Sequence, residues 1–201
     1  MDLVGRPERR AAAERLAAIR AEQMTGHMLL SEALRGGDID EIRAVFDDDA
    51  PFPNVEDPYI SVTLLVLALD QAPLETIRQL LELGADPSSD ASDGFPPLYS
   101  AIIDPPRPDR RAVIELLLSH GADPNQRGIN DFTVLHAAAQ MGDHAVVESL
   151  LEAGADPAAR TRIDDYETPA ETAAACGHDH LAAFLDETVR ASAGDPDDAA
   201  P

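Results

Sequence analysis

The stretch that decides the fold is residues 133–157, which read TVLHAAAQMGDHAVVESLLEAGADP. Within it, Val147, Leu150 and Leu151 recur at the spacing that places side chains on one face of a helix. The threonine at its start is a favoured residue before a helix, and Gly154 suits the left-handed residue that follows one. The stretch therefore predicts a short helix, a tight turn and a second helix.

The same pattern recurs along the chain. Gly-Ala-Asp-Pro occurs at 84–87, 121–124 and 154–157, so that successive copies start 37 and 33 residues apart. Each copy follows an apolar helical pattern and a second short element that begins with threonine or proline. In the last of these elements, Thr168 and Glu171 have the spacing of a capping box. A period of this length indicates a stack of repeated units.

The unit resembles the ankyrin repeat, whose period is about 33 residues and whose signature is T-P-L-H-x-A. The resemblance implies an all-α ankyrin-repeat solenoid of five helix-turn-helix units with short hairpin fingers. The units are expected at about 28–58, 59–89, 90–125, 126–158 and 159–187, between an N-terminal amphipathic helix at 1–27 and an acidic disordered tail at 188–201.

Several units depart from the signature. The first ends in Asp48-Asp49-Ala50 in place of Gly-Ala-Asp, the second has Ala72 where glycine is usual, and the third carries extra residues at 104–109. Terminal units are expected to be atypical, because one face of each has no neighbouring unit. We therefore expect Leu16 and Ile19 of the N-terminal helix to pack on the first unit. In the centre of the array, the repeat register predicts that Leu150 is buried.

The charge of the chain excludes some kinds of partner. The net charge is −23, and all 15 basic residues are arginine. A chain this acidic is a poor binder of nucleic acid or anionic membrane, because both carry the same sign of charge. Cys176 is the single cysteine, so no internal disulfide framework can form. With no apolar segment long enough to span a bilayer, the composition predicts a cytoplasmic monomer.

The candidates for chemistry are few. Cys176, His178 and His180 could bind a metal or form a reactive thiol, but Gly177-His178 lies where ankyrin repeats commonly carry Gly-His between their two helices. His136 is the histidine of the signature, which in the family ties the backbone at the start of the helix. The expectation is therefore no catalytic residue, no metal and no cofactor, and a thiol- or metal-dependent enzyme is the third hypothesis.

Binding is the better-supported function. The resemblance implies an extended concave surface formed by the fingers and the exposed ends of the first helices. The residues expected to bind a partner there are Tyr59, Asp70, Gln71, Asp93, Phe95, Asp104, Asn130, Phe132, Gln140, Met141, Asp165 and Glu167.

Aromatic residues in the fingers have two interpretations. Phe95 and Phe132 are either interface anchors or packing between adjacent fingers, and for Tyr166, which replaces a usual glycine, packing is favoured. As anchors, Phe95, Phe132 and Met141 would form one apolar strip surrounded by acids.

The predicted function is non-catalytic protein–protein binding. A sharper alternative is an immunity or antitoxin-type inhibitor, whose acidic groove masks a basic enzyme such as a nuclease. The acidity could equally serve solubility, or be an adaptation to high salt. A protein partner is expected in either case, and a basic one under the inhibitor hypothesis.

Overall fold

The computed structural model describes residues 25–57, 62–89, 96–103, 107–162 and 166–192. Residues 25–36 are helical and precede α2 (Ile39–Arg43), α3 (Leu64–Gln71), α4 (Leu74–Glu82), α5 (Pro97–Ile103), α6 (Arg110–Ser119), the 3₁₀ turn η1 (Ile129–Asp131), α7 (Val134–Met141), α8 (His144–Glu152), α9 (Pro169–Ala175) and α10 (Asp179–Ser192).

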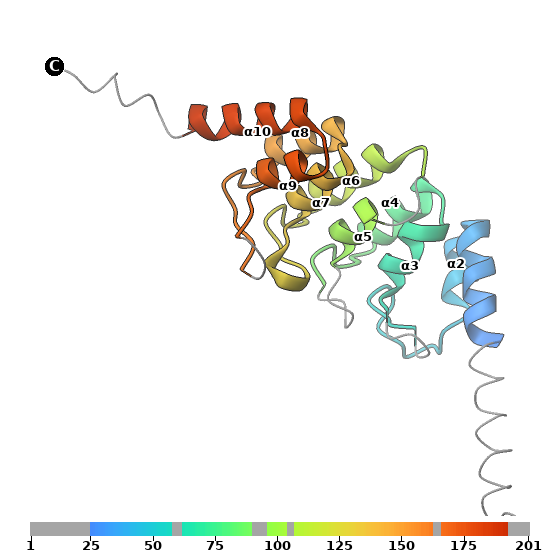
Figure 1. Ribbon diagram of the computed structural model, residues 1–201. Helices are drawn as coiled ribbons and strands as arrows, with labels where there is room; N and C mark the ends of the chain where they lie inside the picture. The colour runs from blue at the N-terminus through green and yellow to red at the C-terminus, as the bar shows by residue number, and fades with distance from the viewer. Residues whose placement is uncertain (1–24, 58–61, 90–95, 104–106, 163–165, 193–201) are drawn as a thin grey trace, which may run out of the picture.

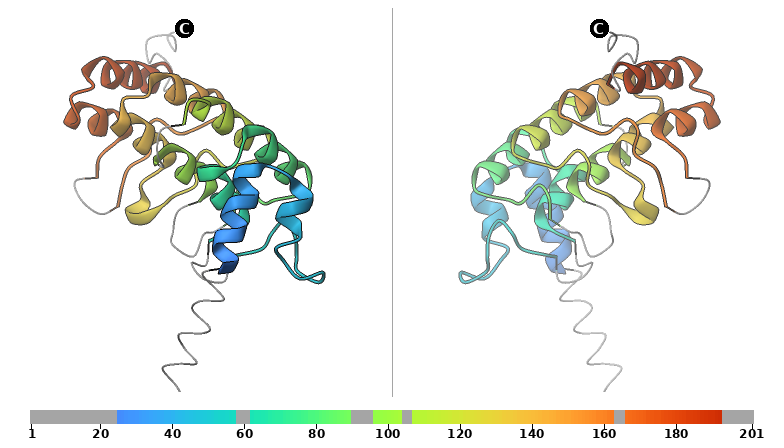
Figure 2. Two further views of the ribbon diagram at one scale, coloured as in Figure 1. Left: turned by 90° about the vertical axis from the view of Figure 1, so that its right-hand side faces the viewer. Right: turned by 90° about the vertical axis from the view of Figure 1, so that its left-hand side faces the viewer.

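These helices form two rows (Figure 1). The first helices α3, α5, α7 and α9 contact one another in succession, and the second helices α4, α6 and α8 do the same. Side views show the units stacked into a curved array (Figure 2). This arrangement confirms the predicted all-α solenoid.

The ends of the helices follow the sequence signals. Thr133 and Thr168 cap α7 and α9, and both caps are complete capping boxes, the second with Glu171 as predicted. Gly84, Gly121 and Gly154 have φ values of 95°, 93° and 93°. This left-handed conformation is readily adopted by glycine, so each Gly-Ala-Asp-Pro segment ends a second helix and turns the chain toward the next unit.

The core runs through the whole array. Leu80, Leu117 and Leu150 each lie four residues before the turn glycine, and all three are fully buried, at 0% exposure. The burial of Leu150 confirms the prediction made from the repeat register. Because equivalent leucines occupy the same place in successive units, the apolar faces merge into one continuous core.

The first unit is less regular than its sequence register suggests. The helix of residues 25–36 crosses the boundary expected between residues 27 and 28, while Leu16 and Ile19 lie outside the described residues. The second helix, α2, ends at Arg43 after five residues. Continuing it would place residues 47–49, three aspartates, at its C-terminus, where negative charge opposes the helix dipole.

The last helix is longer than expected. Helix α10 extends to Ser192, so the prediction of a disordered tail from residue 188 is wrong for its first five residues. The hydroxyl groups of Thr188 and Ser192 donate to the carbonyls of Phe184 and Thr188. The chain has no glycine or proline between Thr188 and Gly194, so no helix-breaking residue interrupts the helix there.

Candidate interaction surface

The exposed ends of the first helices form a row along one side of the array. We define the helix-end row as Asp70, Gln71, Ile103, Gln140, Met141 and Cys176, which occupy the last positions of α3, α5 and α7 and the C-cap of α9. Neighbouring first helices pack together, so these ends lie on successive units.

Two large apolar side chains of this row are exposed on adjacent units. Ile103 at the end of α5 is 41% exposed, and Met141 at the end of α7 is 43% exposed. Gln140 and Asp70 beside them are also exposed, whereas Gln71 is half-buried. An apolar centre with polar neighbours is the composition of a protein interface.

The end of α3 is fixed by a side chain from the next unit. Arg107 donates from Nη1 to the Leu69 carbonyl at 2.6 Å and from Nη2 to the Ala72 carbonyl at 3.2 Å. The Asp109 carboxylate accepts from Arg107 Nε at 2.7 Å and from Nη2 at 3.0 Å. This bond with the guanidinium lowers the pKa of Asp109. The clamp holds the segment that carries Asp70 and Gln71.

The sequence interpretation missed the role of Arg107. Two signals could have revealed it: Ala72 replaces the glycine that usually ends a first helix, and residues 104–109 are an insertion that contains an arginine and two aspartates. A cation beside the last carbonyls of a helix is favourable. The insertion supplies that cation from the neighbouring unit.

The end of α7 has a similar contact. His178 Nε2 lies 3.1 Å from the Gln140 carbonyl, to which it donates. Its ring lies so close to Gly142 that a Cβ there would come within 2.6 Å of it. This contact gives His178 a structural role, and the thiol of Cys176 is exposed. Among the described residues, no group of three histidine, cysteine or acidic side chains could hold a metal ion.

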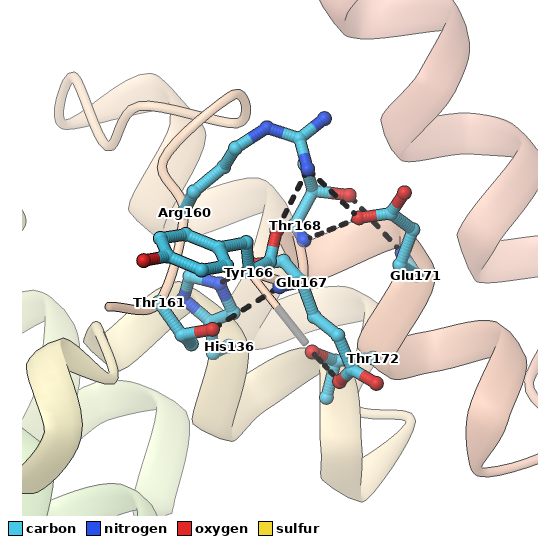
Figure 3. A network of polar contacts seen from close by, with 8 residues as sticks. All are labelled: His136, Arg160, Thr161, Tyr166, Glu167, Thr168, Glu171 and Thr172. Carbon is cyan, nitrogen blue, oxygen red and sulfur yellow. Dashed lines mark hydrogen bonds and ion pairs between the residues drawn. The ribbon is translucent and has the colours of Figure 1, made fainter. Parts of the chain in front are cut away.

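The joint between the fourth and fifth units is built around His136 (Figure 3). Its ring is fully buried, and Nε2 donates to the Glu167 carbonyl at 3.0 Å. Nδ1 lies 2.7 Å from Thr133 Oγ1 and accepts from the Thr133 N–H at 3.3 Å. Burial lowers the pKa of His136. The neutral ring therefore ties the start of α7 to the next finger, which is the role implied by the resemblance.

The predicted binding residues of the fingers have different surroundings. Asn130 is exposed. The ring of Phe132 is half-buried with its centroid 5.0 Å from that of His136 and packs against the core, which corresponds to the packing alternative. Glu167 is half-buried, and its carboxylate accepts from the Thr172 hydroxyl at 3.4 Å. Of these three residues, Asn130 is the most available to a partner.

Tyr166 differs from the sequence interpretation. Its side chain is 62% exposed, so the expectation that the ring packs between fingers is wrong. The ring lies on the opposite side of the finger from Glu171 (Figure 3). The backbone has φ 55°, and Arg160 Nη1 donates to the Tyr166 carbonyl at 2.7 Å. The backbone of Tyr166 is therefore held in place while its ring faces solvent.

Five predicted binding residues cannot be placed. Tyr59, Asp93, Phe95, Asp104 and Asp165 lie outside the described residues. The apolar strip of Phe95, Phe132 and Met141 therefore stays a prediction, with Phe132 turned toward the core and Met141 exposed. Among the described residues of the third unit, Ile103 is the exposed large apolar side chain, and it lies one unit away from Met141.

No helix in the described part of the chain is both long and apolar enough to span a membrane.

Comparisons with known proteins find ankyrin repeats in the second half of the chain. The family model described as ankyrin repeats, in three copies, matches residues 107–195. The chain is 36% identical over 80 residues to the human 2-5A-dependent ribonuclease, and the match covers 39% of this chain and 10% of that protein. It is 38% identical over 79 residues to the rat cyclin-dependent kinase 4 inhibitor B, covering 39% of this chain and 57% of that protein.

Residues 107–195 of the chain are ankyrin repeats. The matched residues include α6 to α10, and in the preceding part of the chain α3 packs against α4 in the same way. Ankyrin repeats generally mediate protein–protein interaction and are typically non-catalytic. The family therefore implies protein partners for this chain.

Proposed function

We propose that the chain binds a protein partner through the concave side of the array, with the helix-end row at its centre. The observation that carries this proposal is the exposure of Ile103 and Met141, at 41% and 43%, at the ends of adjacent first helices. Truncating such apolar anchors weakens a complex most when polar neighbours exclude water around them. Gln140 and Asp70 are exposed at neighbouring positions of the row.

The scaffold supports this proposal because it holds the row in a fixed shape. Arg107 clamps the end of α3, and His178 contacts the end of α7. A surface that is ordered before binding loses less conformational entropy in the complex. Tyr59, Asp93, Phe95, Asp104 and Asp165 stay as predicted members of the same surface.

The test uses the full chain as bait and three single substitutions. Ile103→Glu and Met141→Glu place a charge in the helix-end row, and Leu83→Glu places one at the C-cap of α4, where Leu83 is 49% exposed. Once a partner is purified, its affinity for each variant is measured by calorimetry. We expect the first two changes to weaken binding by about 1–3 kcal/mol and the control to have little effect. The reverse pattern would place the interface on the second helices.

A second candidate is inhibition of a basic enzyme by the same surface. The net charge of −23 favours fast association with a basic protein, and one relative is named as an inhibitor, of cyclin-dependent kinase 4. The chain would then abolish the activity of its partner in a stoichiometric titration. The association rate would fall steeply as salt is raised. An active partner in the saturated complex would leave binding without inhibition.

A further inference from the structure

The first unit contains an open cavity beside its short second helix. After α2 ends, residues 44–55 form a loop, and a cavity of about 530 Å³ is lined there by residues that include Val45, Phe46, Asp47 and Glu56. A second cavity, of about 470 Å³, shares Phe46 and Asp47 and extends to Phe52. Because they share these lining residues, we treat the two cavities as one first-unit pocket.

The first-unit pocket has an aromatic wall. The rings of Phe46 and Phe52 lie 6.4 Å apart between centroids, and both are half-buried. The guanidinium carbon of Arg43 lies 4.9 Å from the centroid of the Phe52 ring. A guanidinium group of this chain thus already rests on one ring of the pair. The face of an aromatic ring attracts such a cation, most strongly where water is partly excluded.

Carboxylates surround this wall. Asp40, Asp47, Asp48 and Glu56 line the two cavities, and all four are exposed. Within the described residues, no arginine or histidine lies within ion-pair distance of any of the four. Among the described residues, Arg43 is the one basic residue that lines the pocket. The pocket therefore combines apolar surface with unneutralised negative charge.

We propose that the first-unit pocket binds an arginine side chain presented by an exposed segment of a partner protein. The planar guanidinium can stack on Phe46 while its N–H groups donate to Asp47 or Glu56, a combination that the compact, strongly hydrated ammonium of lysine matches less well. The site is separate from the helix-end row. Failure of either proposal therefore leaves the other standing.

The test is an NMR titration of the ¹⁵N-labelled full chain with N-acetyl-arginine amide. Its matched control is N-acetyl-citrulline amide, which has nearly the same shape and no charge. We expect saturable shifts confined to the amides of residues 40–56, with citrulline binding at least about tenfold more weakly because it cannot pair with the carboxylates. N-acetyl-lysine amide, which lacks the planar group, should bind more weakly than arginine.

Two pairs of substitutions distinguish binding in the pocket from a general effect of the negative charge of the chain. Asp47→Asn with Asp48→Asn should weaken arginine binding by about three- to tenfold, because the charge that attracts the guanidinium is removed. Asp186→Asn with Glu187→Gln removes the same charge from exposed positions of α10 and should change nothing. Phe46→Leu, checked for an unchanged melting temperature, should also weaken binding.

Three results would overturn the proposal. They are an absence of shifts at residues 40–56, equal affinity for arginine and citrulline, and equal weakening by both pairs of acid substitutions. Each would show that the pocket does not recognise a guanidinium group. A purified partner that binds through the helix-end row would be unaffected by these outcomes.

Discussion

The junction after the first unit and the junction after the third unit use the same contact in different surroundings. Asn54 donates from Nδ2 to the Gly84 carbonyl at 2.9 Å and accepts from the Asp86 N–H at 2.8 Å. Asn125 makes the same two bonds, at the same distances, to Gly154 and Asp156. Yet the second helix has five residues in the first unit and ten in the third.

This comparison shows which part of a unit is constrained. An asparagine amide can both donate and accept, so one side chain satisfies a carbonyl and an N–H group that the left-handed turn leaves open. The junction therefore needs one suitable residue, whereas the length of the second helix can vary. In the first unit the shortened helix leaves room for the first-unit pocket.

The largest expected effect separates the regular core from the first unit. Leu150→Ala should lower the free energy of unfolding by roughly 2–5 kcal/mol, because it leaves a cavity at a fully buried position. Val45→Ala, at a half-buried position of the first unit, should cost less. Urea denaturation of both variants measures the difference. A loss under about 0.5 kcal/mol for Leu150→Ala would contradict the register of the array.

The next effect tests whether the two junctions are equivalent. Asn54→Ala and Asn125→Ala should each lower the free energy of unfolding by about 1–3 kcal/mol, since each removes two hydrogen bonds. Gln140→Ala, at an exposed position of α7, is the control and should cost little. Equal losses for the two asparagines support the comparison. A large loss for Asn125 with none for Asn54 would show that the first unit is not coupled to the array in this way.

A smaller effect of opposite sign is expected in the fingers. Asp131 and Tyr166 both lie two residues before a capping threonine, with φ values of 58° and 55°. Tyr166→Gly should raise the free energy of unfolding by about 1 kcal/mol, because a left-handed conformation is unfavourable for an aromatic residue. Asp131→Gly should gain less, since it also loses the 2.7 Å ion pair with Arg162. Thermal denaturation compares them, and a destabilised Tyr166→Gly would show that the exposed ring contributes to the fold.

The smallest effect is a pH dependence of the His136 junction. Burial lowers the pKa of His136, so above its ordinary value of about 6.5 the ring is neutral in the folded and unfolded chains. Below that pH, His136 takes up a proton in the unfolded chain before it does so in the folded chain. The free energy of unfolding therefore decreases as the pH falls, until the pH reaches the lower pKa of His136 in the folded chain. Since pH 6 is only half a unit below the ordinary value, the loss there stays under about 1 kcal/mol.

The matched variant for this effect is His136→Gln. Between pH 7.5 and pH 6, the melting temperature of the wild type should fall by more than that of the variant. This comparison does not depend on the absolute stabilities of the two proteins. The other histidines and the carboxylates are present in both proteins and cancel in the comparison. Equal slopes would contradict the assignment of a neutral, buried ring to His136.

The repeat made much of the fold predictable. The register from Gly154 placed Leu150 in the core, and Thr168 with Glu171 formed the expected capping box, because both signals are local and recur. Other features depend on neighbouring units. The reach of Arg107 to the Leu69 carbonyl joins residues 38 apart, and no local pattern reports it.

The central claim is that partners bind the helix-end row and not the second helices. Hydrogen–deuterium exchange on the full chain, free and in complex with a purified partner, tests it most directly. Our account predicts slower exchange on binding in α5 and α7 and in the finger of residues 127–132, with α4 and α6 unchanged. Protection confined to α4, α6 and α8 would contradict it.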